Sequence, residues 1–363
     1  MRLYNYPLLI FICLFCTLNG FAQSIPFDDT LWAYAEGTEH QVETIDGQKT
    51  LMLNGRAEVR GQHFTDGSIE VDVFARPERS FGGISFRKQD DTMEEVYLRL
   101  HKSGQADAIQ YTPIYNGESN WQLYREHQAA YRYQVGEWHR LMIKVSGHTA
   151  TVYVDNKEVL QIDQLRTSHT EGGIGLFALF GARFANFRVV HQEPAVAEIP
   201  SLSDMPEGLV TRWKVSQSMP YGKGVKVPQD TAGYQVYATE ASGLLPISKY
   251  IVKSSGGDFE GNGEDYVVVR LDIRADGPLD KAFTFDYSDR VIVFLNGRKL
   301  YEGNNAFRQK GVQYMGHLAP DTHKLYLPLK EGSNVLECLI IERANGWGLT
   351  GRFPDTEGIE LIY

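Results

Sequence analysis

The stretch FTDGSIEVDVFARPE, residues Phe64–Glu78, carries the clearest structural signal in the chain. Polar and apolar residues alternate from 68 to 73, and the apolar members are Ile69, Val71 and Val73. Such alternation is typical of a β-strand that buries one face and exposes the other. The stretch therefore predicts a half-buried strand, with Asp66-Gly67 as the turn that precedes it.

Similar short segments recur on both sides of this strand, separated by turn residues such as Asn-Gly, Ser-Gly and Asp-Asn pairs. The segments are Gly83–Arg87, Val96–His101, Ala108–Ile114, Trp121–Tyr124, His139–Val145, Ala150–Val154, Gly173–Phe180 and Ala185–Val190. No stretch has a convincing helical period. Many short strands at close spacing predict an all-β sandwich or jelly roll over residues 23–192.

The pattern stops in residues 193–208, which contain three prolines and no alternation, and we interpret this segment as a linker. A long loop within one domain is the alternative. Alternation resumes at Tyr266–Ile273, and Asn296-Gly297 lies between two further apolar runs, the strongest short signal for a hairpin. The sequence thus predicts a second β-sandwich over residues 209–363, so that the fold class is all-β with two tandem sandwiches.

Residues 1–22 have the features of a secretory signal peptide. Arg2 gives a positive start, Pro7–Cys16 is an apolar run, and Gly20-Phe21-Ala22 offers small residues for cleavage. The apolar run is too short for a membrane span, which needs roughly 20 residues. We therefore expect a secreted protein, periplasmic or extracellular, with no transmembrane segment; a short membrane anchor is the alternative.

Composition narrows the classes of partner. The formal net charge is −10 and charges of both signs are spread along the chain, so no basic stripe is available for nucleic acid. Cys338 is the one cysteine that remains after cleavage, and its apolar neighbours indicate a buried core residue rather than a nucleophile. The exported protein is thus expected to fold without an internal disulfide.

The first predicted sandwich resembles a known superfamily. Its strings FTDGSIEVDVFARPE, GGISFR, YLRLHKSG, WHRLMIKVSGHTATVYVDNKEVLQID, GGIGLF and FANFRV occur in a characteristic order. In this order they resemble the concanavalin A-like lectin/glucanase superfamily, in particular its laminin-G-like and 3-keto-disaccharide-hydrolase-type members. The resemblance covers residues 26–192 and implies a fold rather than a function, because the superfamily holds lectins, hydrolases and spacers.

The second predicted sandwich has a weaker resemblance. Its strings FDYSDRVIVFLNGRKLYEG and YLPLKEGSNVLECLIIE are similar to galactose-binding-like sandwiches, which accompany many glycoside hydrolases. Trp347, between Gly346 and Gly348, is either a sugar platform or, more commonly, a packed sandwich tryptophan.

Glycoside hydrolysis generally uses two carboxyl groups that flank the scissile bond. Glu70 and Asp72 are two apart on one predicted strand, so both side chains share a face. The spacing is similar to the Glu-x-Asp-x-Glu strand of the glucanases, but Phe74 occupies the third position, where the general acid would be. Glu70 and Asp72, with His101, are the candidate catalytic residues; an ordinary solvated strand face is the alternative.

A carbohydrate site needs flat aromatic rings and planar hydrogen-bonding groups. Candidates gather on predicted strands and turns of the first sandwich: Arg87, Tyr97, Arg99, Gln110, Tyr111, Asn116, Trp121 and Tyr124. We expect these side chains to converge on an exposed sheet and to bind a glycan or oligosaccharide. In the alternative, the arginines form ion pairs across strands and the aromatic rings pack under a loop.

The histidines show no metal-binding spacing, so no metal site and no cofactor are predicted. One acidic, glycine-rich stretch, Asp258–Asp265, is similar to the start of a calcium loop, so a structural calcium is the alternative to a solvated turn. Val269 occupies the position of the EF-hand glutamate, which excludes that motif.

Three hypotheses follow from the sequence. The first is a secreted carbohydrate-binding or carbohydrate-processing accessory protein. The second is a glycoside-cleaving enzyme of the 3-keto-disaccharide-hydrolase type, which requires Glu70 or Asp72 to face the same groove as Arg99 and Trp121. The third is a structural module that binds a protein partner, which predicts an exposed apolar patch without convergent polar groups.

Overall fold

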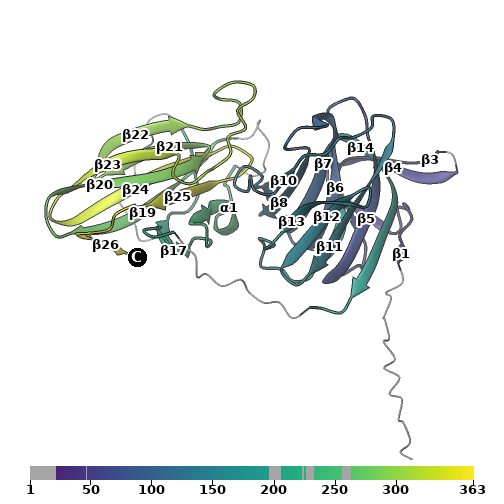
Figure 1. Ribbon diagram of the computed structural model, residues 1–363, viewed down its shortest axis with the longest axis horizontal. Coiled ribbons are helices and arrows are strands. Elements are labelled where there is room, and N and C mark those ends of the chain that lie inside the picture. Colours follow the sequence, from purple (N-terminus) through teal and green to yellow (C-terminus); the bar gives the residue numbers. More distant parts are fainter. Residues whose placement is uncertain (1–21, 46, 196–205, 223–224, 226–232, 256–262) are drawn as a thin grey trace, which may run out of the picture.

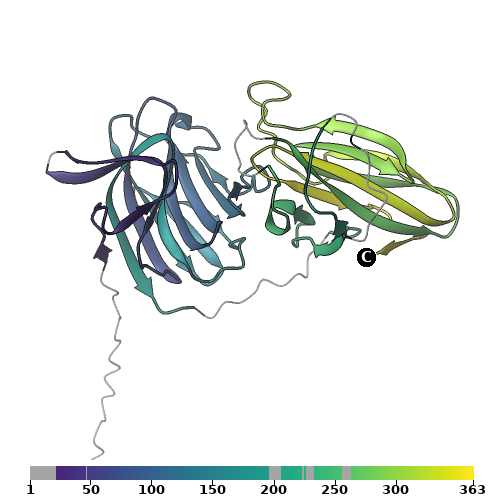
Figure 2. The ribbon, with the colours of Figure 1, turned by 180° about the vertical axis from the view of Figure 1, so that it is seen from behind.

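The computed structural model describes residues 22–45, 47–195, 206–222, 225, 233–255 and 263–363. The predicted signal peptide, apart from Ala22, the middle of the predicted linker and most of the acidic stretch Asp258–Asp265 lie outside the described residues. The described chain forms two β-sandwiches in tandem, as the sequence predicted, and Figures 1 and 2 show them side by side.

Fourteen strands make up the first sandwich. They are β1 (Gln23–Ser24), β2 (Trp32–Tyr34), β3 (Glu39–Ile45), β4 (Gln48–Val59), β5 (Asp66–Phe74), β6 (Phe81–Gln89), β7 (Thr92–Arg99), β8 (Ile109–Tyr115), β9 (Glu118–Ser119), β10 (Gln128–Ala129), β11 (Trp138–Ser146), β12 (Thr149–Val154), β13 (Lys157–Ile162) and β14 (Gly173–Gln192). A 3₁₀ turn, Leu100–Lys102, follows β7.

Strand β14 joins the two layers of this sandwich. Its first part pairs with β6, its second part pairs with β5, and the register shifts between Ala178 and Ala182. Phe180 and Gly181 have positive φ at this point, which bends the strand from one layer to the other. We call the layer β10-β8-β7-β6 the β7 sheet and the layer β5-β11-β12-β13 the β11 sheet.

The core of the first sandwich lies between these two sheets. Alternating residues of both sheets point inward, such as Val96 and Leu98 from β7 and Ile69, Val71 and Val73 from β5, all fully buried. Burial of one face on each sheet is what the alternation of polar and apolar residues predicts. The remaining residues of each strand therefore point to one of two outer faces, on opposite sides of the sandwich.

The second sandwich packs an eight-stranded sheet against a four-stranded sheet. Its elements are β15 (Arg212–Val215), β16 (Met219–Pro220), β17 (Gln235–Ala238), β18 (Leu244–Pro246), α1 (Ile247–Tyr250), β19 (Asp265–Ala275), β20 (Leu279–Ser288), β21 (Arg290–Leu295), β22 (Arg298–Asn304), β23 (His323–Leu329), β24 (Gly332–Glu342), β25 (Gly348–Arg352) and β26 (Ile359–Ile362). No helix within the described ranges has the length and apolarity needed to cross a bilayer.

Two details of the second sandwich confirm the sequence predictions. Asn296 and Gly297 both have positive φ in the two-residue turn between β21 and β22, as a type I′ hairpin requires. Cys338 is fully buried in the core, and burial raises the pKa of its thiol to about 12. Trp347 is also fully buried in this core, so it is not a sugar platform.

One predicted strand is wrong. The segment 121–124 forms a turn, in which the Leu123 amide donates to the Asn120 carbonyl oxygen. Its apolar side chains Leu123 and Tyr124 pack against Leu244 and Leu318 of the second sandwich instead of joining a sheet. A contact between sandwiches can therefore give the same apolar pattern as a short strand.

Candidate functional site

The outer face of the β7 sheet carries the candidate site. On β7 the inward Val96 and Leu98 leave Tyr97 and the strand's last residue, Arg99, on the outer face, and on β8 the outward residue between Ile109 and Tyr111 is Gln110. Because β7 and β8 are adjacent antiparallel strands, with Tyr97 directly opposite Gln110, these side chains meet across the ladder.

Arg99 is the centre of this group. Its Nη1 donates to Asp107 Oδ2 at 2.7 Å, and its Nη2 donates to Tyr97 Oη and to Gln110 Oε1, both at 3.3 Å. The Lys102 ammonium lies 3.5 Å from the same Asp107 oxygen. Arg99 is 4% exposed, and its Nε has no hydrogen-bond partner among the described residues. The buried guanidinium is therefore held rigidly, and its Nε–H group is a donor without an acceptor in the described part of the chain.

Trp121 connects this group to the second sandwich. The Arg99 guanidinium lies over its ring, 4.9 Å from the centroid, and the Trp121 indole Nε1 donates to Asn345 Oδ1 at 3.0 Å. Phe307 and His317 contact the ring edge-on, with centroids 5.9 and 5.5 Å away. Trp121 is only 8% exposed, so its ring packs between the sandwiches and is not the open platform that the sequence suggested.

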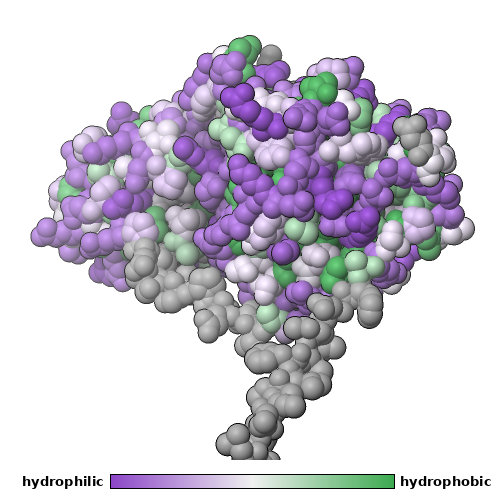
Figure 3. Space-filling model, turned by 45° about the vertical axis from the view of Figure 1, so that its right-hand side comes forward, coloured by the Kyte–Doolittle hydropathy of each residue, from purple (hydrophilic) through white to green (hydrophobic). Residues whose placement is uncertain are grey.

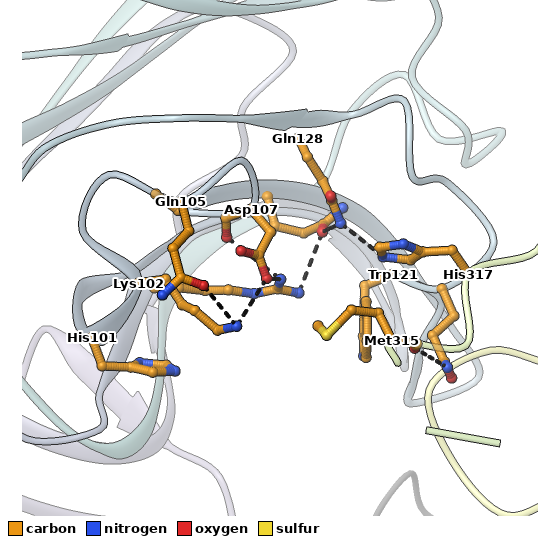
Figure 4. Close-up of polar contacts among 12 residues, drawn as sticks. His101, Lys102, Gln105, Asp107, Trp121, Gln128, Met315 and His317 are labelled. Carbon is orange, nitrogen blue, oxygen red and sulfur yellow. Dashed lines mark hydrogen bonds and ion pairs between the residues drawn. The ribbon is translucent and has the colours of Figure 1, made fainter. Parts of the chain in front are cut away.

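A loop of the second sandwich, residues 305–318, forms one side of the site. Gln122 Nε2 donates to the Met315 carbonyl oxygen at 2.6 Å, and Gln128 Nε2 lies 3.1 Å from His317 Nε2. Figure 4 shows Met315 and His317 facing Lys102, Asp107 and the other polar side chains of the first sandwich. The site therefore lies where both sandwiches meet.

His101 lies at the other side of the site and is half-buried. Its Nδ1 is 3.2 Å from the Ser80 carbonyl oxygen, which can only accept a hydrogen bond, so Nδ1 carries the proton of the neutral ring. The second ring nitrogen, Nε2, then keeps a lone pair. Burial is the main cause that lowers the pKa of His101, so the ring is neutral near pH 7.

Several aromatic residues of this outer face were not predicted from the sequence. Phe177 packs on Tyr97, Tyr97 packs on Phe81, and Phe81 packs on His101, with ring centroids 5.6, 5.9 and 4.9 Å apart. Phe180 extends the row at 6.1 Å from Phe81 and is 49% exposed. The alternation of the sequence could have identified two of these rings. Phe81, which directly precedes GGISFR, and Phe177, the last residue of GGIGLF, both fall at outward positions of their strands.

The structure does not bring Glu70 and Asp72 to this site. They alternate with the inward Ile69, Val71 and Val73 and so lie on the outer face of the β11 sheet, on the opposite side of the sandwich. Glu70 accepts from Arg188 Nη1 at 2.9 Å, and Asp72 accepts from Arg140 and Asn186. The prediction that these carboxyl groups share a groove with Arg99 is therefore wrong.

Two of the predicted binding residues are also turned away from the surface. Arg87 is 1% exposed and donates to Asp66 Oδ1 at 2.8 Å, so it forms the ion pair that was the alternative interpretation. Tyr111 points into the core and donates to Glu94 Oε2. Tyr111 faces inward because it directly opposes the inward Val96 in the β7–β8 register.

The last two predicted binding residues bind the second sandwich. Asn116 Nδ2 donates to the Ser248 carbonyl oxygen at 2.7 Å, and Tyr124 Oη donates to Glu240 Oε1 at 2.8 Å. Of the eight predicted binding residues, the structure thus brings four together at the site. These four are Tyr97, Arg99, Gln110 and Trp121.

Two other features of the described residues are weaker candidates for a site. In the part of the chain that the structure describes, no group of three or more His, Cys, Asp or Glu is arranged to hold a metal ion. A cavity of about 330 Å³ lies in the second sandwich, beside the stacked Tyr237 and Tyr250, but its lining has no charged side chain. Neither feature offers the convergent charged and aromatic groups found around Arg99.

The first sandwich matches a known family model. Residues 31–190 match a family model described as a 3-keto-α-glucoside-1,2-lyase-like domain. The search of curated proteins gives no match.

Two solved structures are similar over the same part of the chain. The carbohydrate-binding module CBM66 from Bacillus subtilis is 15% identical, with a TM-score of 0.34, and the match covers 43% of this chain and 93% of that one. A β-glucanase from Bacillus licheniformis is 12% identical, with a TM-score of 0.35, and the match covers 48% of this chain and 100% of that one. At this identity and TM-score, the likeness says nothing about function.

Proposed function

We propose that this protein recognises carbohydrate on the outer face of the β7 sheet, where the 305–318 loop of the second sandwich meets it. The observation that carries the proposal is the group around Arg99. It combines a rigid planar guanidinium and amide, which suit neighbouring hydroxyls, with aromatic rings that suit the apolar faces of sugars. The family match over residues 31–190 supports a carbohydrate-related role.

Secretion, the galactose-binding-like character of the second sandwich and a structural calcium are proposed from the sequence alone. Secretion rests on residues 1–22 and the galactose-binding-like character of the second sandwich rests on its sequence strings alone. A structural calcium in the acidic stretch is likewise an expectation from its residues.

A protein-interaction module is the weaker alternative. Such a module predicts a contiguous exposed apolar patch. The face in Figure 3 is mainly hydrophilic, with small scattered apolar areas. The large exposed apolar side chains of the described residues, such as Leu31, Val135, Val252 and Val312, are spread over both sandwiches. The convergent polar groups around Arg99 favour a small polar ligand instead.

Cleavage by elimination is a second candidate function, which the geometry of His101 favours. In a glucoside with a ketone at C3, the proton on C2 is acidic because the resulting carbanion is stabilised by the ketone. One base can remove this proton, after which the C1–O bond breaks, a C1=C2 double bond forms and the departing oxygen takes up a proton. His101 Nε2 supplies such a base, and no pair of carboxyl groups is then needed.

Binding is tested with a matched pair of variants. Phe81→Ala removes a half-buried ring from the outer face of the β7 sheet, and Phe74→Ala removes one from the outer face of the β11 sheet. We expect the wild type to bind members of a glycan array. In titration calorimetry with such a glycan, Phe81→Ala should weaken binding about tenfold and Phe74→Ala less than twofold. Equal effects of both variants, or no glycan bound by the wild type, contradict the proposal.

Cleavage is tested with a 3-keto-α-glucoside as substrate. The expected product has a C1=C2 double bond conjugated with the ketone, which absorbs in the ultraviolet. We expect absorbance to grow with the wild type and with His148→Gln, which changes a turn residue outside the site, and to grow at least 100-fold more slowly with His101→Gln. If both variants keep the wild-type rate, His101 is not the base.

A further inference from the structure

The segments that border the site are unusually cationic. Residues 76–81, 99–107 and 305–318 together contain only two acidic side chains, Glu78 and Asp107. The same segments contain six cationic side chains: Arg76, Arg79, Arg99, Lys102, Arg308 and Lys310. In a chain with a formal net charge of −10, this surplus marks a local departure from the overall charge.

Contacts between side chains place these segments around one surface. The Arg79 guanidinium lies 4.4 Å from the Phe180 ring centroid and 5.7 Å from that of Phe81, which in turn packs on His101. At the other end, Phe307 packs on Trp121, and the Arg308 guanidinium lies 4.8 Å from the Phe307 centroid. The cations therefore border the same face rather than different sides of the molecule.

Acidic groups at the site balance only part of this charge. Asp107 is shared by two cations, Arg99 at 2.7 Å and Lys102 at 3.5 Å. In the 305–318 loop, Lys310 Nζ donates to the neutral Asn305 side chain at 2.7 Å. The guanidinium of Arg99 also keeps a buried Nε donor without a hydrogen-bond partner within the described ranges.

Both histidines of the site respond to the same positive field. After burial, which is the largest cause, the charges of Arg99 and Arg125 lower the pKa of His317 to about 4, against the opposing charge of Asp107. For His101, burial again comes first, and the charges of Arg79, Lys102 and Arg99 lower the pKa further, against the opposing bond to Ser80. Cations on both sides of the site therefore lie close enough to act on these two rings.

We infer that the site selects an anionic saccharide, one that bears a carboxylate or a sulfate group. This inference rests on the proposed carbohydrate function and names the class of sugar. A neutral sugar would use the hydroxyl-binding groups but would offer no negative charge to the cations that border the site. An anionic group near Lys102 and Arg308 would complement them, and Arg side chains bind carboxylate and sulfate oxygens in a planar fork.

The test compares neutral and anionic ligands of equal length. Titration calorimetry is carried out with galactotriose, trigalacturonate and sulfated galactotriose, alongside a glycan array with neutral, uronate-bearing and sulfated members. We expect at least one anionic class to bind about tenfold or more tightly than its neutral counterpart at 50 mM NaCl, and the ratio to shrink at 500 mM NaCl because salt screens charge. The uronate and sulfate arms show which anionic group is selected.

Variants locate the effect. Arg308→Gln should weaken anionic binding about fivefold and leave neutral binding within twofold, and Lys102→Gln should weaken anionic binding at least as much. Lys144→Gln, which changes an exposed lysine on the outer face of the β11 sheet, should change neither. Equal binding of neutral and anionic sugars overturns the inference and leaves the proposed function standing. Absence of binding to every saccharide in the calorimetry and on the array overturns both.

Discussion

Arg87 and Asp66 show what a charged pair does inside a sandwich rather than on its surface. Arg87 is 1% exposed and Asp66 is 3% exposed, and Asp66 also accepts from the backbone amides of Gly147 and Ala195. Removing one partner leaves the other charged and buried. We expect Arg87→Ala to lower the free energy of unfolding by about 3–5 kcal/mol, measured by urea denaturation.

The matched control is the ion pair between Arg188 and Glu70, 2.9 Å apart on the outer face of the β11 sheet. Its partners are 36% and 22% exposed, so Arg188→Ala should cost about 0–1 kcal/mol. If both variants lose the same free energy, burial does not decide the strength of these pairs.

The loop 305–318 is the element that completes the site, and one glycine sets its position. Gly316 has a φ of +71°, and a Cβ there would lie 2.2 Å from Gln122 Nε2 and 2.6 Å from the Asn305 carbonyl oxygen. We expect Gly316→Ala to push the loop away from the first sandwich. Glycan binding should weaken about tenfold, because Met315 and His317 move away from Arg99 and Trp121.

Gly311 in the same loop provides the control for this prediction. It also has positive φ, but no atom lies within 4 Å of where its Cβ would be. Gly311→Ala therefore carries backbone strain without the collision. Calorimetry should show near wild-type binding for Gly311→Ala. A similar loss in both variants would mean that strain in the loop, rather than its contact with the first sandwich, affects the site.

Elements also show how far sequence alone can reach. Alternation correctly separates the buried and outer residues of β5 and β7, because each strand packs one face on the core. It cannot tell which of two layers a strand joins, and so Glu70 and Asp72 were placed with Arg99 although their sheets face opposite sides. It also cannot anticipate that Trp121, Asn116 and Tyr124 pack against a second sandwich, since that contact depends on the arrangement of the two sandwiches.

At the scale of the whole molecule, the two sandwiches meet across buried charges. Glu118 of the first sandwich lies 3.6 Å from Lys253 of the second, and both are at most 5% exposed. Asp289 and Glu342 of the second sandwich are buried beside them, at 7% and 0% exposure. The junction is therefore a polar, titratable surface rather than a simple apolar contact, and its stability should depend on pH.

The sign of this dependence follows from the folded-state pKa values. Burial raises the pKa of Asp289 from 3.8 to about 7, and burial followed by the charges of Asp289 and Glu118 raises the pKa of Glu342 well above 4.5. At a pH between the unfolded and the folded pKa of each group, the folded chain binds more protons than the unfolded chain. The contribution of these two groups to the free energy of unfolding therefore falls as pH rises from about 4 to about 7.

Neutral amides should remove this contribution. We expect Asp289→Asn and Glu342→Gln to gain stability relative to the wild type as pH rises from 4 to 8, with the smallest difference at pH 4, in urea denaturation followed at each pH. Asp163→Asn, at an exposed position, should keep a constant difference across the same range. If the free energy of unfolding of Asp289→Asn and Glu342→Gln, relative to the wild type, instead stays constant with pH, the proton affinity of these carboxyl groups does not change on folding. The junction would then owe its stability to packing, to the ion pair between Glu118 and Lys253, and to hydrogen bonds such as those of Asn116, Gln122 and Tyr124.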